Sequence, residues 1–143
     1  MTAPPIRNSQ STKQPTIKKY RVSFGQIKLL EPYLAEVIID EGIEMDLTKV
    51  GEYHDWIKDH LTPACLLLVN KINHYTFTFE AQQNIARLDN IKAIAIVSYS
   101  KLTTNNSRFI ASIPKDPHWQ LEIFNTRKEA MAWLAFCKDE LCI

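Results

Sequence analysis

The chain of 143 residues has only three glycines, and Gly25, Gly42 and Gly51 lie too far apart to form a phosphate-binding loop. Nucleotide binding through a P-loop or dinucleotide motif is therefore excluded. Three cysteines, an odd number, favour a reducing compartment over a disulfide scaffold. The longest apolar run, residues 64–69, is far shorter than the roughly 20 residues of a membrane helix, and the N-terminus has no apolar signal core. We expect a cytoplasmic protein without membrane insertion.

Recognisable catalytic and metal-binding motifs are also lacking. His54 and His60 are six residues apart, whereas a helical metal site needs a spacing of three or four. Cys65 lies in an apolar segment that would raise the pKa of its thiol, which indicates a core residue. Cys137 and Cys142 would point away from each other on a helix. We predict no metal, no cofactor and no enzymatic activity, although residues distant in sequence could still converge on a site.

Positive charge is concentrated at the start of the chain. The formal net charge is +1, but the first 30 residues hold six bases and no acid, so the remainder carries 11 − 16 = −5. An acidic body argues against nucleic-acid binding, which needs a positive face for phosphates. Residues 1–19 are rich in Pro, Ser, Thr and Gln and are predicted to be a disordered basic tail, with a targeting or polyanion-binding arm as the alternative. Residues 20–143 are then one domain.

The first half of this domain is predicted to begin with two strands. Residues 20–30 form one, in which Gly25 marks a bulge or bend, and residues 33–40 form the second, joined as an antiparallel hairpin. Asp46 caps a helix that runs to about Leu61, and Pro63 ends it. Four apolar residues of this helix share one face: Val50, Tyr53, Ile57 and Leu61.

The second half alternates strands and helices. Residues 64–69 and 91–99 are apolar runs typical of strands covered on both faces. Between them, Thr78 or Thr76 caps a helix over residues 79–88, and a short helix over 103–112 and a strand over 121–124 follow. Thr126 and Glu129 form a capping box for a final helix. This helix points inward the side chains of Ala130, Trp133 or Leu134, Cys137 and Leu141. The order ββαβαβαβα predicts an α/β fold with a mixed, mainly parallel sheet flanked by helices.

Ligands and partners of such sheets meet the carboxyl ends of the strands. The loop after the first central strand holds Asn73, His74, Tyr75 and Phe77, and the loop after the second holds Tyr99 and Lys101. One interpretation is that the polar residues of these loops only form turns and cap the ends of helices. The other is a recognition edge with aromatic anchors and a polar rim. In it, Tyr75 and Phe77 are the anchors, the rim is Asn73, His74 and Lys101, and Tyr99 with Lys101 is the next place to test.

Five segments resemble small uncharacterised bacterial proteins described as SpoIIAA-like or STAS/SEC14-type: residues 64–70, 79–81, 91–97, 122–126 and 129–134. The most specific piece is the pattern Phe-x-x-x-x-x-Ala-x-x-Trp-Leu of Phe124, Ala130, Trp133 and Leu134. Over residues 20–141 the resemblance implies a mixed sheet flanked by helices. It also implies a relationship to anti-sigma-factor antagonists, which bind a kinase partner and are switched by phosphorylation of a serine after the central strand.

The chain departs from the antagonists at that serine. Their Asp-Ser-Ser-Gly site is replaced by Asn70-Lys71-Ile72-Asn73, so the phosphoswitch does not transfer. The nearest hydroxyls, Thr76 and Thr78, are interpreted as helix caps. The sequence thus favours a non-enzymatic protein-interaction or regulatory module with an unknown protein partner. The alternative is a carrier or sensor of a small apolar or lipid-like ligand, for which a homodimer would have to complete the pocket.

Overall fold

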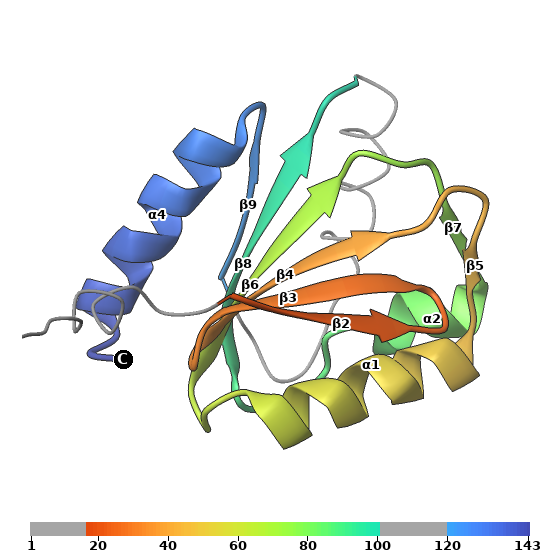
Figure 1. Ribbon diagram of the computed structural model, residues 1–143, viewed down its shortest axis with the longest axis horizontal. Coiled ribbons are helices and arrows are strands. Elements are labelled where there is room, and N and C mark those ends of the chain that lie inside the picture. The colour runs from red at the N-terminus through yellow and green to blue at the C-terminus, as the bar shows by residue number, and fades with distance from the viewer. Residues whose placement is uncertain (1–16, 101–119) are drawn as a thin grey trace, which may run out of the picture.

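The computed structural model describes residues 17–100 and 120–143, in which a six-stranded sheet is packed between helices (Figure 1). The predicted helix over 103–112 and the candidate Lys101 lie outside the described residues. The elements, in chain order, are β2 (Lys18–Val22), β3 (Gly25–Glu31), β4 (Leu34–Ile39), β5 (Glu44–Met45), α1 (Leu47–His60), β6 (Cys65–Lys71), β7 (Thr76–Phe77), α2 (Phe79–Asn84), β8 (Ile91–Ser98), β9 (Gln120–Phe124) and α4 (Arg127–Glu140).

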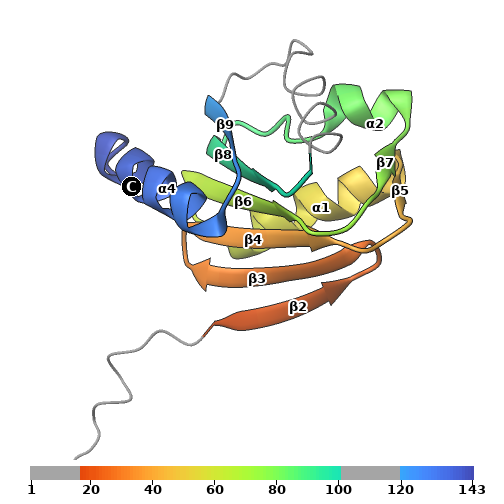
Figure 2. The same cartoon turned by 90° about the horizontal axis from the view of Figure 1, so that it is seen from above.

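The sheet is mixed and mainly parallel, as predicted. Its strand order is β2-β3-β4-β6-β8-β9, which Figure 2 shows from one edge to the other. The strands β4, β6, β8 and β9 pair in parallel, and β3 pairs antiparallel with both of its neighbours. The apolar strands β6 and β8 are central and buried on both faces. A separate two-stranded pairing joins β5 to β7.

The prediction of a single strand over residues 20–30 is wrong. The structure has two strands there, joined by a tight turn at Ser23 and Phe24. Gly25 is the first residue of the second strand. A side chain does not fit at this position, because a Cβ would lie 2.2 Å from the carbonyl oxygen of Ile38 in β4. The first strand begins at Lys18, so Lys18 and Lys19, which were expected in the tail, belong to the sheet.

Two apolar layers cover the sheet, one on each face. The larger layer packs α1 and α2 against the sheet, and the smaller packs α4 against it. In α1, the Asp46 carboxylate accepts from the Lys49 N–H at 3.0 Å, which confirms the predicted cap. The helix ends at His60 with Leu61 as its C-cap, within one residue of the predicted end at about Leu61. Its inward side comprises Val50, Tyr53, Trp56 and Ile57.

The helix α2 is shorter than predicted. It is capped by Thr78 and ends at Asn84 instead of continuing to Leu88. Ala86 takes a left-handed conformation with φ 64°, and its N–H donates to Nε2 of His54 at 3.1 Å. The sequence predicted that α2 would continue past this point. The hydrogen bond from Ala86 to His54, a residue of α1 that is 32 positions away, accompanies the end of the helix.

The helix α4 docks through Ala130, Leu134 and Cys137, which are buried. The sequence did not decide whether Trp133 or Leu134 points inward, and in the structure Leu134 does. Trp133 is only half-buried and lies beside Phe124, with ring centroids 5.7 Å apart. Leu141, which was predicted to point inward, is exposed. A helix has one narrow inward face, and Leu134 rather than Trp133 occupies it.

Thr126 caps α4 as predicted, its hydroxyl accepting from the Glu129 N–H at 3.2 Å. The same hydroxyl donates to the Glu129 carboxylate at 3.0 Å. No helix within the described ranges is long and apolar enough to cross a membrane.

Candidate functional site

Four polar side chains from four neighbouring elements meet on the α4 side of the sheet. They are Glu36 from β4, Asn70 from β6, Tyr99 just after β8 and Arg127 at the start of α4. We call these residues the Glu36 network. Because the strands that carry the first three run in parallel, their side chains project from one face toward the carboxyl edge of the sheet.

Hydrogen bonds connect the network in one continuous line. The Arg127 guanidinium donates to both Glu36 oxygens, from Nη2 at 2.8 Å and from Nε at 3.1 Å. The Asn70 amide donates to Glu36 at 2.9 Å, and the Tyr99 hydroxyl donates to the Asn70 oxygen at 2.8 Å. A bidentate guanidinium bond fixes direction as well as distance, so each member orients the next.

The carboxylate of Glu36 is almost completely buried, with 2% of its side chain exposed. Burial alone would raise its pKa, but the hydrogen bonds from Arg127 and Asn70, with the charges of Arg127 and Lys28, hold the pKa below its ordinary value. Glu36 is therefore ionised at neutral pH. An ionised and fully bonded carboxylate suits a structural anchor better than a proton carrier.

Tyr99 is the member of the network that projects furthest into solvent. It is 53% exposed, although its hydroxyl is held by Asn70. Ile72 is 55% exposed, and these two residues come directly after Lys71 and Ser98, the last pair of the ladder between β6 and β8. The carboxyl edge thus presents an aromatic and an aliphatic side chain on a rigid base. We call Ile72 and Tyr99 the apolar edge.

The predicted anchors in the loop after β6 lie differently. Tyr75 and Phe77 are half-buried, pack against the larger core layer and contact each other with ring centroids 5.7 Å apart. Burial raises the pKa of the Tyr75 phenol, and the Lys71 ammonium lies 5.0 Å from the centre of its ring. Burial also lowers the pKa of Lys71 to about 8. These two aromatic rings support the fold more than they offer contact area.

The polar residues of this loop also differ from one another. The Asn73 amide donates to the Ile39 carbonyl at 2.9 Å, which ties the loop to the end of β4. His74 is exposed, with its backbone N–H on the Glu41 carboxylate at 3.0 Å and its ring nitrogen 3.8 Å from the same group. Of the four candidates in this loop, only His74 stands well out into solvent.

Sequence reasoning missed Glu36, Asn70 and Arg127. One signal was available, because Glu36 interrupts an apolar strand and a buried carboxylate needs a cationic or hydrogen-bonding partner. Its partner Arg127 is 91 residues away, and nothing local identifies it. Cys65 is buried with its thiol pKa raised to about 11, as its apolar surroundings predicted. Across residues 17–100 and 120–143, no three His, Cys, Asp or Glu side chains gather to hold a metal ion.

No family model and no curated protein matches the chain. Among solved structures, the chain is similar to an uncharacterised protein of the DUF3478 family with a SpoIIAA-like fold from Shewanella loihica PV-4. The two are 13% identical, the match covers 83% of this chain and 92% of that one, and the TM-score is 0.47. The solved protein has the SpoIIAA-like fold that the sequence resemblance predicts.

Proposed function

We propose that the chain is a non-enzymatic protein-binding module, and that a partner protein binds at the apolar edge formed by Ile72 and Tyr99. The observation that carries the proposal is the state of Tyr99, which is more than half exposed while its hydroxyl is fixed by Asn70. An aromatic side chain that is already ordered loses little entropy on binding, which is what makes tyrosine effective at protein interfaces.

The Glu36 network supports this role. Asn70 is held by Glu36, and Glu36 is held by Arg127, so the position of the Tyr99 ring depends on the docking of α4. Ile72 adds exposed apolar area just after the neighbouring strand β6, and His74 offers a polar group on the same loop. Anchors surrounded by polar groups that exclude water are the usual composition of a binding hot spot.

The test is capture of a partner from host lysate by immobilised chain, quantified by mass spectrometry. We expect Tyr99→Ala to recover the specific partner at least about tenfold less well, since a central aromatic anchor contributes about 2 kcal/mol or more. Phe79→Ala is the matched control, because Phe79 is 67% exposed but lies on α2, on the opposite side of the sheet. Equal loss with both variants, or no loss with either, would refute the assignment of the partner to this edge.

Tyr99→Phe separates the two parts of the argument. It keeps the apolar ring and removes the hydrogen bond to Asn70, so we expect binding that is weaker than wild type and stronger than with Tyr99→Ala. Native mass spectrometry of the chain purified from its host tests the alternative function. A constant added mass of a lipid-like molecule would identify a ligand carrier instead.

A further inference from the structure

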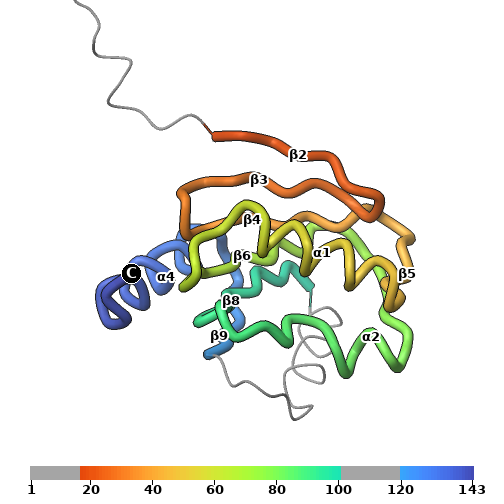
Figure 3. Tube along the Cα trace, turned by 90° about the horizontal axis from the view of Figure 1, so that it is seen from below, coloured from red at the N-terminus to blue at the C-terminus, as the bar shows by residue number. Residues whose placement is uncertain are grey.

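The strand β2 lies at one edge of the sheet, and among the described strands it hydrogen-bonds only β3 (Figure 3). In an antiparallel ladder, alternate backbone groups of a strand point away from its partner. Within residues 17–100 and 120–143, no strand pairs with the N–H and C=O groups on the outer side of β2. Such an edge can accept a further strand from another protein.

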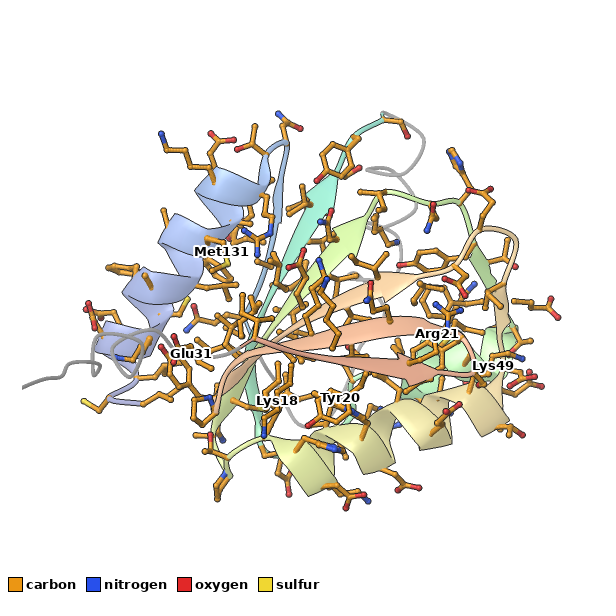
Figure 4. All side chains as sticks on the ribbon, in the orientation of Figure 1. Lys18, Tyr20, Arg21, Glu31, Lys49 and Met131 are labelled. Carbon is orange, nitrogen blue, oxygen red and sulfur yellow. The ribbon has the colours of Figure 1, made fainter. Side chains whose placement is uncertain are left out.

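Two bases of β2, Lys19 and Arg21, lie on one face of the strand, and Arg21 is already paired with the Asp40 carboxylate. Lys19 and Arg21 alternate with Tyr20 along the strand, so the two bases point to the α4 side and the tyrosine points to the α1 side. Tyr20 and Arg21 are labelled in Figure 4. Lys18 adds a third base to this strand of five residues. Tyr20 packs edge-on against Trp56 and near His60 of α1, which fixes the strand on that side.

Lys19 and Lys28 are direct cross-strand partners between β2 and β3. Like charges at such positions destabilise a sheet. The charge of Lys28 favours the ionised form of buried Glu36, whereas Lys19 lies one strand further from this carboxylate. Glu36 is the cross-strand partner of Lys28 on its other side, but its two oxygens already accept three hydrogen bonds, from Arg127 and Asn70. The Lys19–Lys28 pair thus carries excess positive charge next to the open edge.

We propose that an acidic, extended segment of a partner protein adds to β2 as a further strand, with its carboxylates beside Lys19 and facing the Lys28 side chain one strand further in. A segment of alternating acidic and apolar residues matches the strand, because its apolar side chains would fall on the Tyr20 side. A second copy of β2 would set bases against bases and is disfavoured. A nucleic acid is disfavoured because the chain beyond residue 30 carries a net charge of −5.

The probe is a short peptide of alternating glutamate and valine, added to the full chain and followed by backbone NMR and amide hydrogen exchange. We expect slowed exchange in residues 18–22 and an affinity that falls as salt is added. The double variant Lys19→Glu and Lys28→Glu should weaken binding by roughly tenfold or more, because two attractions become repulsions. Lys92→Glu is the control, since Lys92 is exposed like Lys19 but lies at the start of β8.

Changes in the peptide keep the proposal testable even if a variant folds poorly. Replacing glutamate by lysine, or methylating alternate backbone nitrogens so that they cannot pair with β2, should each abolish binding. Equal affinity for the lysine peptide, or full affinity for the methylated peptide, would overturn the proposal. The proposal would also be overturned if amide exchange of β2 were already slow without peptide and the chain sedimented as a dimer. Tighter binding of a DNA duplex than of the acidic peptide would overturn it as well. The apolar edge takes no part in these measurements, so their failure leaves the function proposed for Tyr99 standing.

Discussion

The most informative perturbation is Arg127→Met, which removes the cation from the buried carboxylate of Glu36. The variant loses two of the three hydrogen bonds to this carboxylate and leaves a charge whose side chain is 2% exposed. Breaking a fully buried ion pair costs about 3–5 kcal/mol. Here the arginine side chain is 45% exposed, so water can replace part of its contribution, and Asn70 still donates. We expect a loss of about 1–3 kcal/mol at neutral pH.

The pH dependence of this loss identifies its origin. In the wild type the folded pKa of Glu36 lies below its ordinary value of 4.5, so its contribution is complete above that pH and is lost as pH falls through the lowered pKa. In the variant, burial without the arginine raises the pKa of Glu36 above the value in the unfolded chain. Protonation then stabilises the folded variant as pH falls. The difference in stability between the two proteins should therefore shrink between pH 7 and about pH 4.

The assay is urea denaturation followed by far-ultraviolet circular dichroism at a series of pH values. Lys128→Met is the control, because Lys128 is the next residue of α4, is exposed, and removes the same charge from the same helix end. The assignment of the cost to an unpaired Glu36 would be refuted if the difference in unfolding free energy between wild type and Arg127→Met stayed constant with pH. It would also be refuted if this difference were no larger than the difference between wild type and Lys128→Met.

Three further predictions follow from single contacts. Gly25→Ala should cost at least about 2 kcal/mol, because its Cβ would meet a backbone carbonyl at 2.2 Å, whereas Gly51→Ala, with nothing within 4 Å, should be neutral or stabilising by urea denaturation. Trp133→Ala should cost about 1–2 kcal/mol, less than the 3–5 kcal/mol of a buried tryptophan, because its side chain is half-buried; a loss near 4 kcal/mol would contradict that exposure. Burial lowers the pKa of His54 below 6.5, and its neutral ring accepts a hydrogen bond from the N–H of Ala86. The melting temperature should therefore decline as pH falls from 6.5 through the lowered pKa. In His54→Gln this decline should be smaller, and an unchanged dependence of melting temperature on pH would exclude His54 as its source.

Much of the fold could be predicted because it depends on neighbours in the sequence. The apolar runs at residues 64–69 and 91–99 are buried central strands, since a segment apolar on both sides needs cover on both faces. Asp46, Thr78 and Thr126 cap helices because each supplies an oxygen three residues before an unpaired N–H. Such contacts form within one turn of chain, so they can be inferred without knowing the rest.

The candidate site could not be predicted in the same way. The sequence placed recognition among Asn73, His74, Tyr75 and Phe77, whereas the structure buries part of the two rings and ties Asn73 to β4. A loop residue is exposed or buried according to what packs over it, and periodicity carries no information about that.

Tertiary structure alone brings together Glu36 and Arg127, which are 91 residues apart, and Lys19 and Lys28, which face each other only because the chain turns at Ser23. It also brings His54 of α1 to the Ala86 N–H just beyond the end of α2. The sequence by itself determined the element types, the central strands and the caps, because local spacing and hydrogen bonding set them. Partners, faces and exposure were decided by the order in which the strands pair, since strand order sets which distant side chains share a surface.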